Sequence, residues 1–279
     1  MTGAIDLSKL PAVDFTPQLT IEQITAEAIT WLADNEGDII EGPGDPRYRL
    51  IRSLAVRERL LRQASNEAHK NRTLAYGRGA ALDHTGTTYH HTERLLNETD
   101  DDYRHRCALA PEGYSTAGPI GAYLFHAKSA SENVKDVEFI SPQPLDVILP
   151  VLSTEGDGTA NQALLNSVAH AVNQDHVRPQ GDRVTVQSAE ILTYSISGTV
   201  HTYPGPDHNI VKAAALKALQ TYTKEEHRLQ GIVSDSGIKA HTHLPGVAYV
   251  ALNNWADIFA EKHQAPYCTA ITLTVKEVM

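Results

Sequence analysis

Residues 178–190 read RPQGDRVTVQSAE, a turn rich in Pro, Gly and Asp that leads directly into a strand. The strand pattern continues to Tyr203 without an obvious stop, and six of its apolar residues share even positions, so one side is largely apolar, with Ser188 and Glu190 as a polar interruption. A polar interruption at constant phase is expected of one ribbon that leaves a first hydrophobic core and enters a second. The apolar positions are Val184, Val186, Leu192, Tyr194, Ile196 and Val200.

The turn before this ribbon has two interpretations. Its residues are Arg178, Pro179, Gly181 and Asp182, of the types that form tight turns. One interpretation is an inter-domain turn that helps to fix the angle between two small domains, as an assembly subunit requires. The other is an active-site loop carried by a sheet, which would indicate an enzyme.

Upstream of the turn the predicted order is helix, strand, strand, helix, strand. Ser115 or Thr116 is expected to cap the first helix, and a hairpin around SPQP follows. Thr159 and Gln162 have the spacing of a capping box. This predicts a helix start after the sequence GDG rather than a phosphate loop, because no Lys follows the glycines.

Downstream of the ribbon the predicted order is helix, helix, strand, strand. Ile210, Ala214, Ala218 and Tyr222 are predicted to form the buried face of a long helix, and Ser234 to cap a shorter one. Strands and helices mixed in this way favour the α+β class over one doubly wound sheet. We therefore expect a helical N-terminal arm followed by two small α+β sandwich domains, with boundaries at 1–114, 115–189 and 190–279.

The N-terminal region is predicted to be helical. Thr20 can cap a first helix, and a second, longer helix is expected to start at Pro46 and to run to about Tyr76. Thr99 and the aspartates that follow it are read as the start of another helix, because acidic residues in a first turn favour the helix dipole. A metal site is the alternative for this TDDD run.

The long helix carries a narrow apolar stripe that ends in small residues and is flanked by arginines. Such a stripe suits a helix that packs lengthwise against other helices. Its arginines alternate with apolar positions, which indicates a solvated or partner-facing helix rather than a nucleic-acid site. The predicted partner interface consists of Leu50, Leu54, Arg57, Leu61, Ala64 and Ala68.

Composition predicts a globular chain that binds neither nucleic acid nor membrane. The 279 residues are 41% hydrophobic and 21% charged, and the net charge of -10 opposes binding to phosphate backbones or anionic lipid. No signal peptide and no apolar segment of the ~20 residues that span a bilayer are apparent. Cys107 and Cys268 form neither a CxxC motif nor a disulfide framework, so we expect a reducing compartment.

No motif points to catalysis or to a cofactor. The sequence contains neither GxSxG nor GxGxxG, and the pairs His90–His91 and His241–His243 lack the spacing that places two imidazoles on one helix face. We therefore predict no catalytic residue, no metal and no cofactor. A pair of carboxylates that are distant in sequence stays open, because sequence spacing does not restrict such a pair.

Several segments, in order along the chain, resemble the baseplate J-like family, which comprises baseplate assembly proteins of contractile-tailed bacteriophages and related contractile injection devices. Each motif alone is weakly specific, but their shared order over nearly the whole chain is specific. The region 83–98 departs most from the family. The segments are LAPEGYSTAGPIGAYLFHAKSA (109–130), VKDVEFISPQPLDVILPVLSTEGDG (134–158), VRPQGDRVTVQSAEI (177–191), YPGPD (203–207) and QAPYCTAITLTV (264–275).

The resemblance implies a structural wedge component of the tail baseplate, assembled in the host cytoplasm. It implies N-terminal helices that bundle with a second copy or another wedge protein, and α+β domains that join neighbouring wedges around the central hub and spike. The family supplies no catalytic residues to carry over. A tail-associated cell-wall hydrolase is the main alternative, and an interaction module of another injection apparatus is a third.

Overall fold

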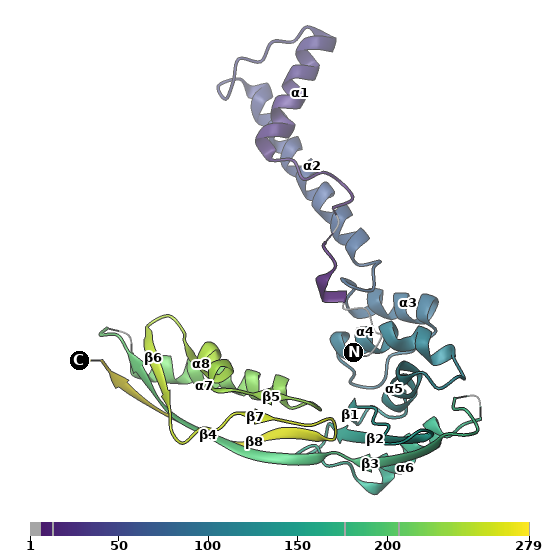
Figure 1. The fold of residues 1–279 in the computed structure, drawn as a ribbon. Helices are drawn as coiled ribbons and strands as arrows, with labels where there is room; N and C mark the ends of the chain where they lie inside the picture. Colours follow the sequence, from purple (N-terminus) through teal and green to yellow (C-terminus); the bar gives the residue numbers. More distant parts are fainter. Residues whose placement is uncertain (1–6, 13, 176, 206, 279) are drawn as a thin grey trace. The chain divides into compact units, whose positions relative to one another are not determined.

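The computed structural model describes residues 7–12, 14–175, 177–205 and 207–278 (Figure 1). These residues form two compact units. The helical unit holds the described residues up to 94 together with 98–108, and the α+β unit holds 95–97 with 109–278. The predicted α+β class with a helical N-terminal region is confirmed.

The helical unit begins with a short 3-10 turn (Leu7–Lys9), followed by two helices that pack against each other, α1 (Ile21–Glu36) and α2 (Pro46–Lys70). Thr20 caps α1 as predicted, since its Oγ1 accepts a hydrogen bond from the N–H of Gln23 at 3.2 Å. The predicted start of α2 at Pro46 is also found, but the helix ends six residues before Tyr76. Past Lys70 the chain continues in turns that lead to the next helix.

Two shorter helices complete this unit, α3 (Gly79–His90) and α4 (Asp100–Leu109). The helix predicted after Thr99 is present as α4. Thr99 caps it, since its Oγ1 accepts a hydrogen bond from the N–H of Asp102 at 3.2 Å. The region 83–98, which resembles the family least, forms most of α3 and the loop that follows it. Leu82, Tyr103 and Cys107 are fully buried where α3 and α4 meet.

The first half of the α+β unit follows the predicted order of elements. A 3-10 turn (Ala110–Tyr114) and α5 (Ile120–Ser129) precede the hairpin of β1 (Val134–Val137) and β2 (Asp146–Ser153). Then α6 (Gln162–Val172) leads to β3 (Arg183–Ser188). The central strand β2 pairs antiparallel with β1 and parallel with β3.

Both helix caps predicted in this half are wrong. Asn161, not Thr159, caps α6, because its Oδ1 accepts from the N–H of Leu164 at 2.9 Å. Asn161 lies at the position from which a side chain reaches the third helical N–H, whereas Thr159 lies two residues too early. Pro119 stands at the N-cap of α5 without a side-chain hydrogen bond, so neither Ser115 nor Thr116 serves there.

The second half is built on the long strand β4 (Glu190–Thr202). It pairs antiparallel with β6 (Val247–Leu252) and parallel with β8 (Gln264–Glu277). Helices α7 (His208–Glu226) and α8 (Asp235–Thr242) pack against this sheet, and Ser234 caps α8 as predicted. A small two-stranded sheet is added by β5 (Ile232–Val233) and β7 (Ile258–Phe259).

The buried face of α7 lies one position away from the predicted one. Val211, Ala215 and Leu219 face the core together with Tyr222, whereas Ile210 is 69% exposed. Alanines occur on both sides of this helix, so the periodicity alone supports either face. The bulk of Leu219 and Val211 against the sheet decides the orientation, because burying these larger side chains removes more apolar surface from water.

The ribbon predicted from the even-phase pattern passes from one sheet to the other at Ala189. The N–H of Ala189 donates to the carbonyl of Val151 in β2, while the N–H of Glu190 donates to the carbonyl of His263, just before β8 (Figure 1). Consecutive N–H groups of a strand point to opposite sides, so β2 and β8 flank the ribbon on opposite edges. The division into separate domains at 189 and 190 stays a prediction.

Candidate functional site

One face of α2 is covered within the helical unit. Ala55 is buried, and the Asn66 side chain is held by the backbone of Thr16, whose N–H and carbonyl each lie 2.8 Å from it. Phe15 stacks on His69 with ring centroids 4.7 Å apart. Together with α1, the segment that precedes α1 therefore covers this face along most of the helix.

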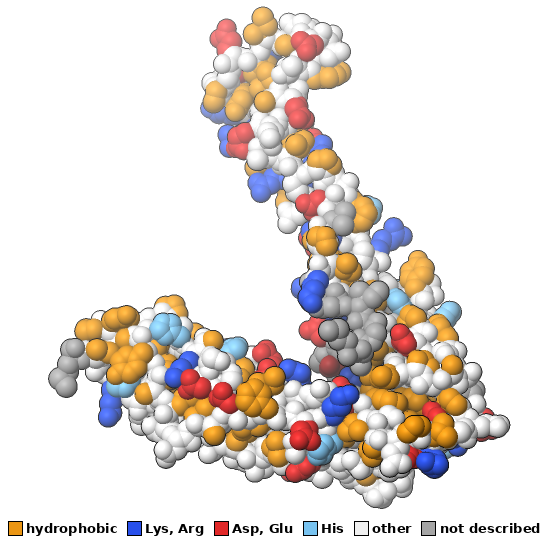
Figure 2. Space-filling model, in the orientation of Figure 1, with side chains coloured by type: hydrophobic (Ala, Val, Ile, Leu, Met, Phe, Trp, Pro, Cys, Tyr) orange, Lys and Arg blue, Asp and Glu red, His pale blue; other side chains and the backbone are white. Residues whose placement is uncertain are grey.

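A second face of α2 is left uncovered, and it carries the predicted interface. All six residues of the stripe are exposed, including Leu50 at 63%, Leu54 at 57% and Leu61 at 70%. Figure 2 shows hydrophobic side chains at the surface of these N-terminal helices, interspersed with charged ones. An exposed row of large apolar side chains is unusual on an isolated helix and marks a surface suited to a partner. The assignment as a partner interface stays a prediction.

The turn of residues 178–182 lies against α5 in the first half of the α+β unit. Tyr123 Oη donates to Asp182 Oδ2 at 2.6 Å, and the guanidinium of Arg178 donates to the Asp182 carbonyl at 2.9 Å. Pro179 packs so closely on Gly118 that a Cβ there would lie 2.9 Å from the ring. The turn thus orients the start of β3, and its effect on the angle between the two halves stays a prediction.

The two halves of the α+β unit meet in a small apolar cluster that the sequence did not reveal. Leu152 and Ala189 from the first half pack with Leu229 and Ala265 from the second. The carboxylate of Asp136 accepts from the N–H of Leu229 at 3.2 Å and pairs with Lys128 at 3.0 Å. No local pattern signals a contact between residues so far apart in the chain.

His227 also lies at the junction between the two halves of the α+β unit. Its Nδ1 is 2.8 Å from the carbonyl of Pro266, and its ring lies edge-on to Tyr267. Gly158 approaches it so closely that a Cβ there would be 3.0 Å from the imidazole. Burial lowers the pKa of His227, and nearby Lys135 lowers it further. The junction therefore holds a neutral imidazole where a charged one would be poorly solvated.

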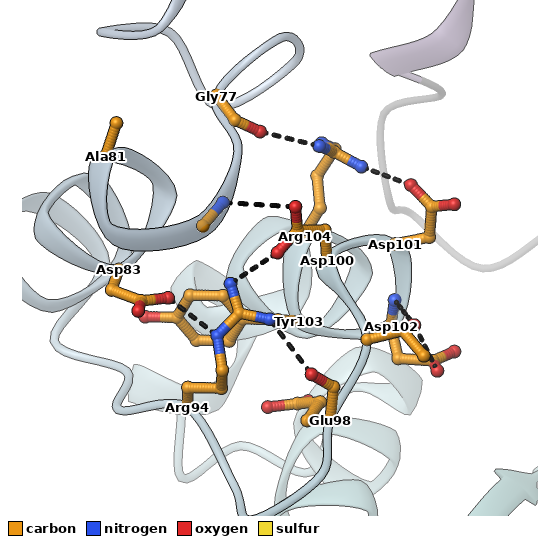
Figure 3. Close-up of polar contacts among 12 residues, drawn as sticks. Gly77, Ala81, Asp83, Arg94, Glu98, Asp100, Asp101, Asp102, Tyr103 and Arg104 are labelled. Atoms are coloured by element: carbon orange, nitrogen blue, oxygen red, sulfur yellow. Dashed lines mark hydrogen bonds and ion pairs between the residues drawn. The ribbon is translucent and has the colours of Figure 1, made fainter.

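A charged network ties α3 to α4 (Figure 3). Arg94 binds Asp83 at 2.6 Å and Asp100 at 2.7 Å, and its guanidinium lies 4.5 Å from the centre of the Tyr103 ring. The N–H of Gly79 and Arg94 hold the pKa of Asp100 below its usual value. Burial raises the pKa of Tyr103 to about 12. The TDDD run thus belongs to a helix start and an ion-pair network.

A second pair in this network is more deeply buried. Arg106 and Glu98 meet at 2.7 Å with side chains only 5% and 8% exposed. The guanidinium of Arg106 makes a further hydrogen bond to the carbonyl of Glu93. A buried pair of this kind is stable only when both charges are present and hydrogen-bonded. The loop after α3 is therefore fixed by charge as well as by packing.

The histidine pairs considered as metal ligands do not form a site in the described ranges. His241 stacks on Tyr222, and its Nδ1 lies 2.8 Å from the carbonyl of Gly237. Across residues 7–12, 14–175, 177–205 and 207–278, no three His, Cys, Asp or Glu side chains come together in a way that could hold a metal ion. Helices long and apolar enough to cross a membrane are likewise not found in these ranges.

Comparison with known proteins assigns the family. The model of the baseplate J-like N-terminal domain matches residues 44–101, and that of the baseplate J-like central domain matches 115–188. The sequence is 38% identical to Baseplate protein J of Escherichia phage P2, over 288 aligned positions that cover 95% of each chain. The chain belongs to the baseplate J-like family. The N-terminal match includes all of α2 and its stripe, and the central match ends at the last residue of β3.

Proposed function

We propose that this chain is a structural protein of a phage tail baseplate, where it joins wedge subunits into a ring around the central hub and spike. The observation that carries the baseplate role is the 38% identity to Baseplate protein J over 95% of both chains. A relationship across the full length supports a shared role for the whole chain rather than for one module. Its partners are other baseplate proteins and further copies of itself, and its place is the tail of the virion after assembly in the host cytoplasm.

The proposed division of labour separates a helical arm from two α+β domains. The helical region 1–114 is an arm that bundles with helices of other baseplate chains, and the α+β domains at 115–189 and 190–279 form the ring. Two features support this assignment. The stripe of α2 is exposed although leucines make up half of it, and the second half of the α+β unit carries an extensive hydrophobic cluster of its own.

Substituting Leu54 and Leu61 together by Asp tests the arm. Both side chains are exposed, so the isolated chain should keep its thermal stability, whereas a partner helix would have to bury two unpaired carboxylates. We expect binding to the baseplate proteins encoded beside this chain, co-expressed with it, to be lost in pull-down. Calorimetry of the isolated variant should still show a cooperative transition.

The matched control places two aspartates on α2 outside the stripe, at the exposed positions Ser53 and Gln63. This control should retain binding. The arm assignment is wrong if the stripe variant binds its partners as well as the control does. It is also wrong if the stripe variant unfolds at a much lower temperature, because the leucines would then belong to the core of the isolated chain.

A further inference from the structure

We infer that the helix that covers the α2 stripe belongs to another polypeptide, is acidic, and presents a carboxylate to Arg57. This inference rests on the proposed function, since it names the partner of the surface proposed there.

The stripe has the spacing of a coiled-coil seam. Its positions are separated alternately by four and three residues, which is the seven-residue repeat of helices that pack side by side. Five of its six members are Leu or Ala, and Arg57, near the middle, is the charged one. A single polar residue in such a seam is a device that selects register and partner, because it must find a complementary group across the interface.

Arg57 is exposed, and it forms no ion pair with the described part of the chain. Among the other arginines of α2, Arg62 is held by Glu58 at 2.6 Å and Arg47 by Asp45 at 2.8 Å. Arg49 and Arg59 likewise form no described ion pair, but they lie outside the stripe, where a covering helix would leave them in water. A helix that covers the stripe removes Arg57 from water. Burying an unpaired guanidinium opposes association, so the covering helix must supply an anion, and a carboxylate forms the two-pronged hydrogen bond that suits Arg.

Charge also argues against a second copy of α2 in this position. The helix carries seven Lys and Arg against two Glu, an excess of five positive charges in a chain whose net charge is -10. A parallel copy in register would place Arg57 against Arg57, and any pairing of two α2 helices brings two basic surfaces together. Within the described residues, the acidic helix α1 forms one ion pair with α2, between Glu22 and Arg52 at 3.6 Å. The basic surface beside the stripe therefore favours an acidic partner.

The sizes of the stripe residues indicate which side chains the partner helix should carry. Leu50 and Leu54 occupy one end, and Ala64 and Ala68 the other. Close packing along the whole seam requires small side chains opposite the leucines and larger apolar ones opposite the alanines. The partner helix should therefore carry its largest apolar residues toward the C-terminal end of α2 and its acid near the middle.

The experiment compares three single variants, each co-expressed with the baseplate proteins encoded beside this chain. Arg57→Glu should weaken binding roughly 100-fold, because it opposes two carboxylates in the seam. Arg57→Lys keeps the charge and should bind within about tenfold of the native chain. The matched control is Arg59→Glu, which makes the same charge change at an exposed position outside the stripe and should change binding only a few-fold. Thermal melts of the isolated variants should coincide, because both arginines are exposed.

Charge exchange completes the test. The acidic residue of the captured partner that crosslinks to position 57 is changed to Arg, and this variant should restore binding to Arg57→Glu. If Arg57→Glu binds as Arg59→Glu does while the Leu54 and Leu61 aspartate variant does not bind, the stripe stands and the carboxylate assignment is overturned. If the aspartate variant binds normally, the proposed function of the arm fails instead. A dimer of the isolated chain that dissociates when Leu54 and Leu61 are substituted would identify a second copy as the occupant and overturn the inference.

Discussion

The carboxylate of Asp136 accepts a hydrogen bond from the backbone N–H of Leu229, 93 residues further along the chain, at 3.2 Å. This bond links the edge strand β1 of the first sheet to the segment between α7 and β5 in the second half. It lies beside the apolar cluster of Leu152, Ala189 and Leu229. The two halves are therefore joined by side-chain contacts as well as by the continuous ribbon.

Replacing Asp136 by Ala should weaken this junction. The variant removes the acceptor of the Leu229 N–H and the partner of Lys128, and hydrogen bonds to charged groups contribute about 1.5–3 kcal/mol. We expect a loss of about 2 kcal/mol in the free energy of unfolding, measured in urea. Glu132→Ala, at an exposed position two residues before β1 begins, serves as control and should change little. Equal stability of the two variants would show that the junction does not depend on Asp136.

Stability should fall on mild acidification through His227. Its folded-state pKa is lowered by burial, so the unfolded chain binds a proton more readily than the folded one. The contribution of the neutral imidazole is fully present above the unfolded value near 6.5 and is lost progressively as the pH falls below it, toward the lowered folded value. The nearby charged groups, Lys135 and Asp157, act in opposite directions.

The measurement is the free energy of unfolding from pH 8 to pH 5.5, for the native chain and for His227→Gln. The difference between the two curves isolates this residue from the other histidines. We expect the native chain to lose stability more steeply below pH 6.5 than the variant. Parallel curves would mean that the histidine is equally protonated in both states.

Glu98→Gln should destabilise the helical unit. The substitution leaves the nearly buried Arg106 without its carboxylate, and breaking a buried ion pair costs about 3–5 kcal/mol. The exposed pair of Lys239 and Asp235 provides a comparison in the α+β unit, where Asp235→Asn should cost at most about 1 kcal/mol. Hydrogen exchange should report faster opening of α3 and α4 in Glu98→Gln. Unchanged exchange in these helices would contradict the role given to the pair.

The orientation of α7 can be tested with two truncations. Leu219→Ala removes a fully buried side chain and should cost about 2–5 kcal/mol. Ile210→Ala removes a side chain that is 69% exposed and should stay within about 0.5 kcal/mol. Both are measured by thermal unfolding of the whole chain. A larger effect at Ile210 would restore the face that the sequence pattern predicted.

The purified chain should not hydrolyse peptidoglycan or generic esters, with or without added zinc. We expect this because the chain is similar to a baseplate protein over nearly its whole length. Its sequence also contains neither the GxSxG motif of serine hydrolases nor the HExxH motif of zinc proteases. Turnover is measured with the intact chain and with variants of single carboxylates and histidines. Activity that copurifies with the chain and disappears in one such variant would favour the cell-wall hydrolase.

Local signals in the sequence predicted most of the elements. Thr20, Thr99 and Ser234 each stand before a helix, where their side-chain oxygens satisfy N–H groups that the helix leaves unpaired. The even-phase pattern of residues 183–203 predicted the ribbon, because alternate side chains of a strand lie on one side. The exposure of the α2 stripe was consistent with its narrow pattern, although no local feature shows what covers it.

The chain's own sequence determined the class of fold, the order of most of its elements and its family, since caps, periodicity and motifs act within a few residues of one another. It did not predict α3 or the small sheet of β5 and β7. The tertiary structure alone decided which face of α7 is buried, which residue caps α6, and that Asp136 meets Leu229. These features depend on how well side chains fill space between elements that are distant in sequence. On a helix with alanines on several sides, different buried faces are almost equal in free energy, and neighbouring polar residues are almost equal as caps. Only packing against the rest of the chain selects one of them.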